Sequence, residues 1–408
     1  MTTMTSSSWQ QGMMTRYESR GVSPLKEKVH TATRNLDKGA FPHAFCRIVP
    51  DVFSGDSASF LVLHSDGVGS KTALAYLHFK ETGDASVFRG IAQDAVVMNT
   101  DDMLCVGALG PFLLSNIVSL NSRVIPDQVL NEIVQGFQDQ VEAFRKWDIP
   151  IILTGGETAD VTDLARTLAV DATMISRVSR ERIIANDRIK PGNIIIGLAS
   201  YGQTTYEREY NSGIGSNGLT SARHELLTAY YGTKYPETFD PGMPVELRYC
   251  GPYRLVDRLT DAPISVGEAL LSPTRSFAPV IRDLLEDARS EISALFHMSG
   301  SGQTKELRTG QGIHYVKDSL FPPPPLFAEI QRVSRTPWRE MYQVFNMGHR
   351  MEVIGSERLV PVLEEIGKRY RLDVRVVGHC EASPIAPRNQ VTVVAPDGER
   401  ITYDGPEA

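Results

Sequence analysis

The sequence is poor in cysteine, and it has neither an excess of positive charge nor a long apolar run. Four cysteines are spread over 408 residues without a CxxC pair, which argues against a disulfide framework and gives no recognised zinc-ligand spacing. Lys and Arg number 42 against 49 Asp and Glu, so no clustered basic surface for nucleic acid is expected.

The sequence also lacks a membrane-spanning or secretory segment. Its longest apolar runs, such as residues 193–200 (NIIIGLAS), are far shorter than the ~20 residues that cross a bilayer. Residues 1–16 are rich in Ser, Thr and Met and contain no apolar signal-peptide core, so we interpret them as a disordered arm. We therefore expect a cytoplasmic protein without membrane or nucleic-acid partners.

What is present is the composition of an ordinary globular protein, 41% hydrophobic and 22% charged, long enough for more than one core. Strand-like and helix-like segments alternate in both halves, which predicts an α/β (α+β) protein of two domains. A turn-rich stretch, DRIKPGN at 187–193, precedes a new apolar run. We therefore predict a boundary near residue 189, between domains 17–188 and 189–408.

The hydrophobic pattern and the residues that start or end helices and strands predict the main elements. Strands are predicted at 59–64, 151–154, 168–178 and 193–200, the second of them ending in a glycine turn. Helices are predicted at 70–83, 89–107 and 126–146. Further helices are expected to open at 216–218 and at 273–274, and four consecutive prolines at 322–325 are expected to be extended.

The first unusual motif is HSDGVGSK at 64–71. It fails the Walker pattern because Ser70 stands where a glycine should precede Lys71. One interpretation is a tight turn in which Asp66 bonds its own backbone. The other is a phosphate-associated loop in which Asp66 holds a metal ion while Lys71 supplies positive charge.

A second acidic segment is the predicted helix that carries Asp94, Asp101 and Asp102 among apolar residues. Carboxylates on a buried helix cost several kcal/mol each unless they are paired or bound to metal. Asp94 and Asp102 are ~12 Å apart along a helix, too far to share one ion but suited to a polyphosphate with its metal ions. The alternative is a solvated helix face.

The third acidic segment is TGGETAD at 154–160, where Glu157 follows two glycines whose N–H groups are expected to be free. Two glycine turns and three acidic segments in one half suggest that Mg²⁺ bridges carboxylates and phosphate oxygens, since this ion prefers oxygen ligands.

The second half adds candidate anion-binding positions. Ser216, Asn217 and Gly218 are predicted at a helix N-terminus, where free backbone N–H groups favour an anion. Thr274 is predicted at another helix start, with Arg275 available to a phosphate or carboxylate. Ordinary helix capping is the alternative at each place, as a satisfied core residue is for His297.

Taken together, these segments resemble the phosphoribosylformylglycinamidine cyclo-ligase (AIR synthetase) family over residues 17–395. The segments that carry the resemblance occur in order: DGVGSK (66–71), the helix of Asp94 and Asp102, GGET (155–158), SNG (216–218), SPTR (272–275) and FNMG (345–348).

The resemblance implies two α/β domains, with the N-terminal sheets of two subunits pairing into a barrel in a homodimer. It implies an enzyme of purine biosynthesis that uses ATP and Mg²⁺ to close formylglycinamidine ribonucleotide to aminoimidazole ribonucleotide, releasing ADP and phosphate. In this family the formyl oxygen is thought to be phosphorylated before the amidine nitrogen attacks and phosphate leaves.

The resemblance also implies roles for residues at matching positions. Catalysis falls to Lys71, Asp94 and His297, and metal binding to Asp66, Asp102 and Glu157. Substrate binding falls to Ser216, Asn217, Gly218, Thr274, Arg275, Lys26 and Lys28. The residues implied to bind ATP and its phosphates are Asp66, Gly67, Gly69, Ser70, Lys71, Gly155, Gly156, Glu157 and Thr158.

The chain departs from the family pattern in two places. Residues 202–218 form a longer loop with Gly215 where relatives have a histidine, so that histidine's role is not carried over; Tyr206, Glu207 and Tyr210 are the candidates to replace it. Ser301 introduces a side chain into a turn that relatives build from glycine.

Other enzymes that share acidic glycine loops fit less well. A selenophosphate synthetase would need a reactive cysteine before Cys46, and a hydrogenase-maturation dehydratase would need a cysteine in the C-terminal tail. Thiamine-phosphate kinases lack the SPTR and FNMG segments in this register. An inactive nucleotide-binding homologue would have no use for so many costly carboxylates.

Overall fold

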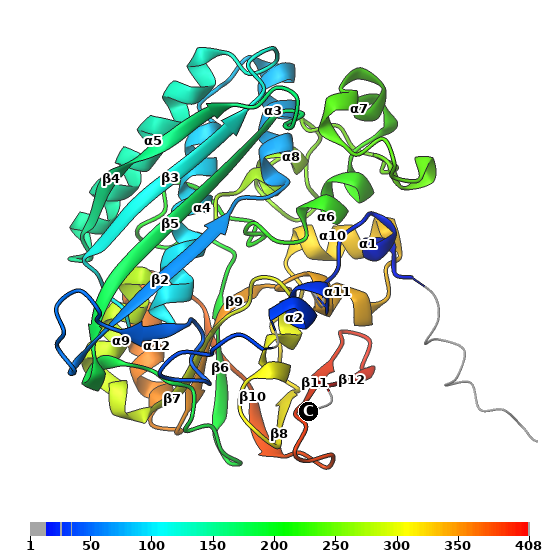
Figure 1. Cartoon of the computed structure of the whole chain (residues 1–408). Helices are drawn as coiled ribbons and strands as arrows, with labels where there is room; N and C mark the ends of the chain where they lie inside the picture. The colour runs from blue at the N-terminus through cyan, green and yellow to red at the C-terminus, as the bar shows by residue number, and fades with distance from the viewer. Residues whose placement is uncertain (1–13, 25–26, 34, 407–408) are drawn as a thin grey trace, which may run out of the picture.

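The computed structural model describes residues 14–24, 27–33 and 35–406. Within these ranges the strands form two sheets (Figure 1), with the orders β1-β2-β5-β3-β4 and β12-β11-β8-β10-β6-β9-β7. The first sheet consists of β1 (Ile48–Pro50), β2 (Ser59–Gly67), β3 (Phe112–Leu120), β4 (Ile151–Asp160) and β5 (Leu168–Ser179). The second consists of β6 (Ile194–Ala199), β7 (Ile292–His297), β8 (Ile313–Lys317), β9 (His349–Gly355), β10 (Val374–Ala382), β11 (Gln390–Val394) and β12 (Arg400–Asp404).

Helices lie against both sheets. They are α1 (Arg16–Ser19), α2 (Glu27–Thr33), α3 (Lys71–Thr82), α4 (Phe88–Leu104), α5 (Asp127–Lys146), α6 (Leu219–Leu226), α7 (Ala229–Lys234), α8 (Val266–Leu271), α9 (Ala278–Ala288), α10 (Pro325–Ser334), α11 (Trp338–Val344) and α12 (Leu359–Tyr370). Helix α5 is amphipathic and buries Val129, Ile133 and Phe137. By contrast, α4 is buried almost throughout because it contacts β2 and β5 on one side and β7 and α9 on the other. The mixed α/β class is confirmed.

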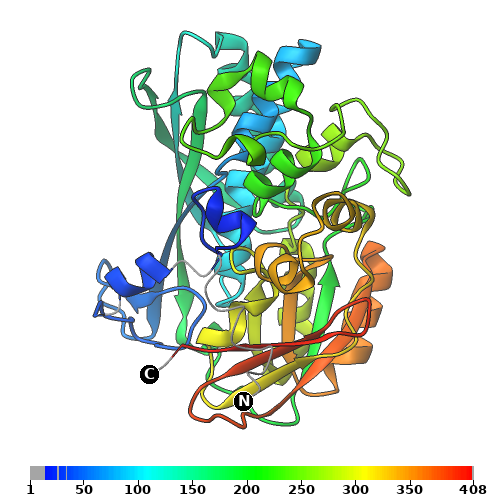
Figure 2. The same cartoon turned by 90° about the vertical axis from the view of Figure 1, so that its right-hand side faces the viewer.

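One face of the first sheet is largely uncovered among the described residues, apart from the end where residues 51–56 contact Arg177. Helices α3, α4 and α5 lie to one side of this sheet, which Figure 2 shows nearly edge-on. Burial alternates along β5, as expected when one face is covered and the other is open. Leu63, Leu113 and Ile117 are exposed on the open face.

Most predicted elements are present, and three predictions of local structure were wrong. The proline run at 322–325 is not extended to its end, because Pro325 begins α10. The strand at 151–154 does not end at a glycine turn, because β4 continues through Gly155 and Gly156 to Asp160, with a register shift against β3. No helix begins at Pro273: residues 272–277 have no regular secondary structure, and α9 starts only at Ala278. Helix α3 ends before Gly83 as predicted, where a φ of 78° favours glycine.

The predicted boundary near residue 189 lies between the last strand of the first sheet and the first strand of the second, and it stays a prediction. Residues 1–13 of the predicted arm lie outside the described ranges, as do Lys26 and its neighbour at 25. The end of the arm is ordered, contrary to the prediction for 1–16, because Arg16 begins α1 and pairs with Glu225 at 2.8 Å.

Candidate active site between the two halves

The structure brings several predicted residues together around the irregular segment Ser272–Phe277, which connects α8 and α9. This segment belongs to the second half but contacts α3 and α4 of the first. Its backbone and side chains bind Lys71, Asp94 and Asp101. The segment is therefore the point at which the charged residues of both halves are fixed.

Lys71 and Asp94 form a completely buried ion pair, with 2.9 Å between Nζ and Oδ1. Lys71 also donates to the carbonyl oxygens of Gly215, at 3.1 Å, and Ser272, at 2.7 Å. Burial lowers the pKa of Lys71, and the nearby Asp94 carboxylate opposes that shift. All three N–H groups of the ammonium are thus used inside the protein, and the predicted direct contact between Lys71 and a phosphate does not fit this arrangement.

Asp94 also fixes Thr274. Its Oδ1 accepts from the Thr274 backbone N–H at 2.7 Å and from the Thr274 hydroxyl at 2.6 Å. Thr274 in turn lies 3.0 Å from the hydroxyl of Ser216. Among the described residues, no hydrogen-bond partner reaches the buried Oδ2 of Asp94. Lys71, Asp94, Thr274 and Ser216, predicted separately, therefore form one connected group.

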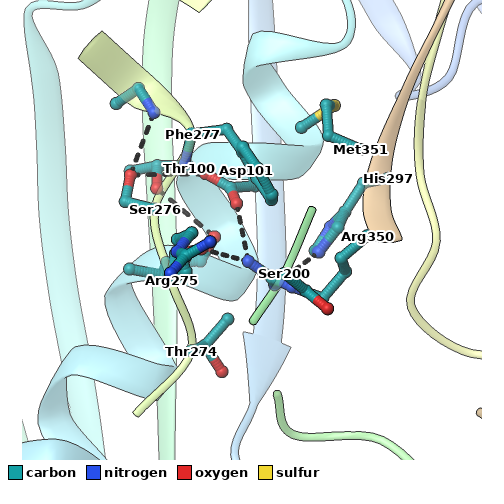
Figure 3. Close-up of polar contacts among 12 residues, drawn as sticks. Thr100, Asp101, Ser200, Thr274, Arg275, Ser276, Phe277, His297, Arg350 and Met351 are labelled. Carbon is teal, nitrogen blue, oxygen red and sulfur yellow. Dashed lines mark hydrogen bonds and ion pairs between the residues drawn. The ribbon is translucent and has the colours of Figure 1, made fainter. Parts of the chain in front are cut away.

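A second buried group is centred on Arg350 of β9, between Asp101 of α4 and His297 of β7 (Figure 3). The guanidinium pairs with Asp101 at 3.2 Å, donates to Nε2 of His297 at 2.9 Å and donates to the carbonyl of Arg275. Burial raises the pKa of Asp101 to about 7, against the pull of Arg350. Arg350 therefore links the segment Ser272–Phe277 to the predicted catalytic histidine.

Asp102 lies between two histidines and not in a metal site. Its Oδ1 is 2.5 Å from Nδ1 of His297, and its Oδ2 is 3.1 Å from Nε2 of His64. Burial opposes ionisation of Asp102, but the two imidazoles outweigh it and hold the pKa well below its usual value. The predicted metal role of Asp102 is not supported by this geometry.

The hydrogen-bond partners fix the protonation of both rings. Asn99 donates its amide N–H groups to backbone carbonyls, so its Oδ1 must accept from Nδ1 of His64. Because Nε2 of His64 faces the Asp102 carboxylate, both ring nitrogens face acceptors, an arrangement that favours the protonated imidazolium. His297 instead accepts from Arg350 and donates to Asp102, so it is neutral; burial lowers its pKa to about 4.

Because His64 pairs with Asp102, the contribution of His64 to the free energy of unfolding depends on pH. The Asp102 carboxylate, against the effect of burial, raises the pKa of His64 above its ordinary value of ~6.5. A raised histidine pKa adds stability that is complete below pH ~6.5 and is lost as the pH rises through the folded-state value. We therefore expect wild type to exceed His64→Gln in unfolding free energy by more at pH 6 than at pH 9, measured by urea denaturation. A difference that does not change between these pH values would contradict the assignment.

The remaining predicted metal ligands do not meet. Asp66 pairs with Ala172 on the helix-covered face, whereas Glu157 pairs with Ile117 on the open face. Their strands are three positions apart, or ~14 Å. No group of three or more His, Cys, Asp or Glu side chains within the described ranges could hold a metal ion. The predicted set of Asp66, Asp102 and Glu157 therefore does not fit a single preformed magnesium site.

The glycine motif at 64–71 has the backbone contact that the tight-turn interpretation requires, and the phosphate-loop interpretation stays a prediction. Asp66 accepts from the next backbone N–H, that of Gly67, at 2.7 Å, as the tight-turn interpretation requires. Gly67 also lies against a carboxylate that the sequence analysis missed, since a Cβ there would lie 1.7 Å from Oδ1 of Asp171 and would displace that side chain. Gly69 has a φ of 63° and leads into α3.

The first turns of α3 and α6 lie side by side. Ser70, at the start of α3, is 2.8 Å from the hydroxyl of Thr220 in α6. Ser216 and Asn217 are partly exposed just before α6. Gly218 has a backbone conformation in the left-handed region, and the Phe345 ring occupies the place where a Cβ at this position would lie. We refer to Gly69, Ser70, Ser216, Asn217 and Gly218 as the polar rim.

Three other predicted residues have different surroundings. Arg275 is buried, and all its N–H groups are used by Glu207 and by backbone carbonyls, so its predicted contact with a phosphate does not fit. Lys26 lies outside the described residues, and Lys28 is exposed on α2. Gly155, Gly156, Glu157 and Thr158 lie on the exposed strand β4.

Sequence reasoning missed Arg350, His64 and Asp171 as site residues. His64 begins the first motif singled out, but it gave no signal of its partner. Arg350 is a fully buried arginine on a strand, and a buried charge requires a partner; the sequence alone does not show that it is buried.

The comparisons with known proteins cover most of the chain. Residues 50–178 match the family model described as "AIR synthase related protein, N-terminal domain". A phosphoribosylformylglycinamidine cyclo-ligase from Methanocaldococcus jannaschii is 29% identical over 319 residues, 78% of this chain and 77% of the relative. The enzyme of the same name from Methanothermobacter thermautotrophicus is 32% identical over 295 residues, 72% of each chain.

Solved structures share the fold at low identity. A HypE–HypF complex matches with a TM-score of 0.54 and 15% identity, covering 93% of this chain and 100% of that one. AaThiL complexed with AMPPCP and TMP matches with a TM-score of 0.51 and 12% identity, covering 93% and 95%. The described residues contain no helix that is both long and apolar enough to cross a membrane.

Proposed function

The chain belongs to the phosphoribosylformylglycinamidine cyclo-ligase family, and we infer that it is the enzyme that closes formylglycinamidine ribonucleotide to aminoimidazole ribonucleotide with ATP. The observation that carries this inference is the 32% identity to a cyclo-ligase over 72% of both chains. ATP gives its γ-phosphoryl group to the formyl oxygen, the amidine nitrogen then attacks the activated carbon, and phosphate leaves with that oxygen. The net products are the imidazole ribonucleotide, ADP, phosphate and a proton.

The polar rim is proposed to bind the phosphate of the substrate ribonucleotide. Two helices begin there, and their free N–H groups and dipoles favour an anion. The contacts of Ser70 with Thr220 and of Ser216 with Thr274 support this role, because they hold the two helix starts together. Thr274 is proposed to contribute through Ser216.

The nucleotide is proposed to bind along the end of the open sheet face. Glu157 lies on this face of β4, beside Gly155, Gly156 and Thr158, while Gly67 ends β2 and the neighbouring Asp66 lies on the helix-covered face. We propose that Mg²⁺ enters with ATP as part of the substrate, since this ion usually needs only one or two protein carboxylates beside phosphate oxygens. Bound in this way, it would neutralise charge on the triphosphate.

The buried residues are proposed to act by position and charge. Lys71 and Asp94 hold Thr274 and the carbonyl of Gly215 beside the polar rim. His297 and Asp102 hold His64 and Arg350. In a site that excludes water, such fixed charges act more strongly than they would in solution.

We further propose a cytoplasmic homodimer in which the open face of the first sheet is covered by a second copy. Support comes from the exposed Leu63, Leu113, Ile117 and Ile152, since monomers rarely expose connected apolar surface of this kind. The measurement is the mass in solution by light scattering, and a monomer at micromolar concentration would contradict the proposal.

The reaction is tested by following phosphate release from ATP by the purified protein with and without formylglycinamidine ribonucleotide, together with the imidazole product. The inference predicts release that depends on substrate and is matched one-to-one by product. Release without imidazole product would contradict it and would favour another chemistry of this fold.

A further inference from the structure

The long loop at 202–218 is held together by hydrogen bonds to the carboxylate of Glu207. This carboxylate accepts from Nε of Arg275 at 3.0 Å to each oxygen and from Nη2 at 2.6 Å. It also accepts from the backbone N–H and hydroxyl of Thr204, at 2.9 and 3.0 Å, and from Nδ2 of Asn211 at 3.1 Å. The loop is therefore folded around this one side chain.

Arg275 is locked by this carboxylate and by the main chain. Its side chain is 1% exposed and that of Glu207 is 12% exposed. The remaining N–H groups of Arg275 donate to the carbonyls of Ala199, Tyr201 and Gly202 at 2.8–2.9 Å. A planar guanidinium with every donor used has one orientation, so the backbone at Arg275 is fixed as well.

That backbone lies between the two buried groups of the site. One residue earlier, Thr274 binds Asp94 through its N–H and its hydroxyl. The carbonyl of Arg275 itself accepts from Arg350. Two further bonds from the loop hold the same segment: Asn211 donates to the carbonyl of Pro273 at 2.7 Å and Tyr206 to that of Ser276 at 2.9 Å.

We propose that Glu207 is a positioning residue for substrate binding, which places Thr274 and Ser216 at the polar rim through Arg275. The proposal deepens the proposed function and rests on it. Glu207 does not touch substrate; it fixes the buried segment from which Thr274 contacts Ser216 of the polar rim. The partners of the Glu207 carboxylate are Thr204, Asn211 and Arg275, which lie away from the strands proposed to bind the nucleotide, so the two substrates should respond differently.

The test compares Glu207→Gln with Glu209→Gln, an exposed glutamate two residues along the same loop. Glu207→Gln is expected to raise KM for formylglycinamidine ribonucleotide at least about tenfold, or about 1.4 kcal/mol, and to leave KM for ATP within about twofold. Glu209→Gln should leave both constants unchanged. A purely structural ion pair would instead reduce the amount of folded enzyme without separating the two constants.

Arg275→Lys and the double variant complete the experiment. Since both single changes break the same link, the double variant should be no worse than the more affected single variant. Glu207→Asp keeps the charge and should show the same separation of KM values to a smaller degree, which allows the test if Glu207→Gln does not fold.

The outcomes separate this proposal from the proposed function. If the wild type is active and Glu207→Gln leaves both KM values unchanged or raises them equally, the positioning role is wrong while the proposed function stands. Additive effects of the two single changes would lead to the same conclusion. Wild type that makes no imidazole product would overturn the proposed function and this proposal with it.

Discussion

Replacing Lys71 by methionine is expected to lower the free energy of unfolding by about 3–5 kcal/mol, because it leaves Asp94 as an unpaired buried carboxylate. Both side chains are completely buried, and Lys71 also satisfies two backbone carbonyls. The catalytic activity of Lys71→Met should fall as well, because the Lys71 ammonium also binds the carbonyl of Gly215, next to Ser216. The measurement is urea denaturation followed by circular dichroism.

Two further variants show whether the effect belongs to the ion pair. Lys80→Met changes an exposed lysine of the same helix and should cost little. Lys71→Met combined with Asp94→Asn removes the stranded charge while keeping an oxygen that can accept from Thr274, so it should recover part of the loss. If Lys71→Met is as stable as Lys80→Met, the buried pair described here is wrong.

Replacing Asp102 by asparagine is expected to lower kcat at least about 100-fold while costing only about 1–3 kcal/mol of unfolding free energy. Asparagine has nearly the same shape but cannot accept at both oxygens, and it carries no charge to stabilise the His64 imidazolium. The Nδ1–H of His297 or the Nε2–H of His64 would then face an N–H group. Arg350 and Asp101 would lose the orientation that His297 gives them.

The check is kcat together with a thermal melt, so that loss of folded enzyme is separated from loss of turnover. Asp163→Asn, at an exposed carboxylate, is the matched control and should leave both unchanged. An Asp102→Asn enzyme with wild-type kcat would show that the paired histidines have no part in the reaction.

The sequence predicted those elements that are decided locally. An apolar run entering a glycine motif gave β2 and α3, and the spacing of Val129, Ile133 and Phe137 gave α5. The strand prediction stopped too early in β4, because its glycines signal a turn while pairing with β3 carries the strand through them. Tertiary pairing overrode the local signal there.

The sequence also marked most residues of the site but not their partners. Asp102 and His297 were both singled out, yet they are 195 residues apart and nothing in one sequence pairs them. Arg275 was expected to bind a phosphate, a reasonable role for an arginine after a proline turn. Its actual partner, Glu207, belongs to a loop whose path is set only in the folded chain.

If ATP phosphorylates the formyl oxygen before the imidazole ring closes, that oxygen leaves in the released phosphate. The decisive measurement uses substrate carrying ¹⁸O in the formyl group, followed by mass spectrometry of the released phosphate. We expect one ¹⁸O atom in each phosphate for every imidazole formed. Imidazole formed while the label appears in water, with unlabelled phosphate, would contradict phosphorylation of the formyl oxygen.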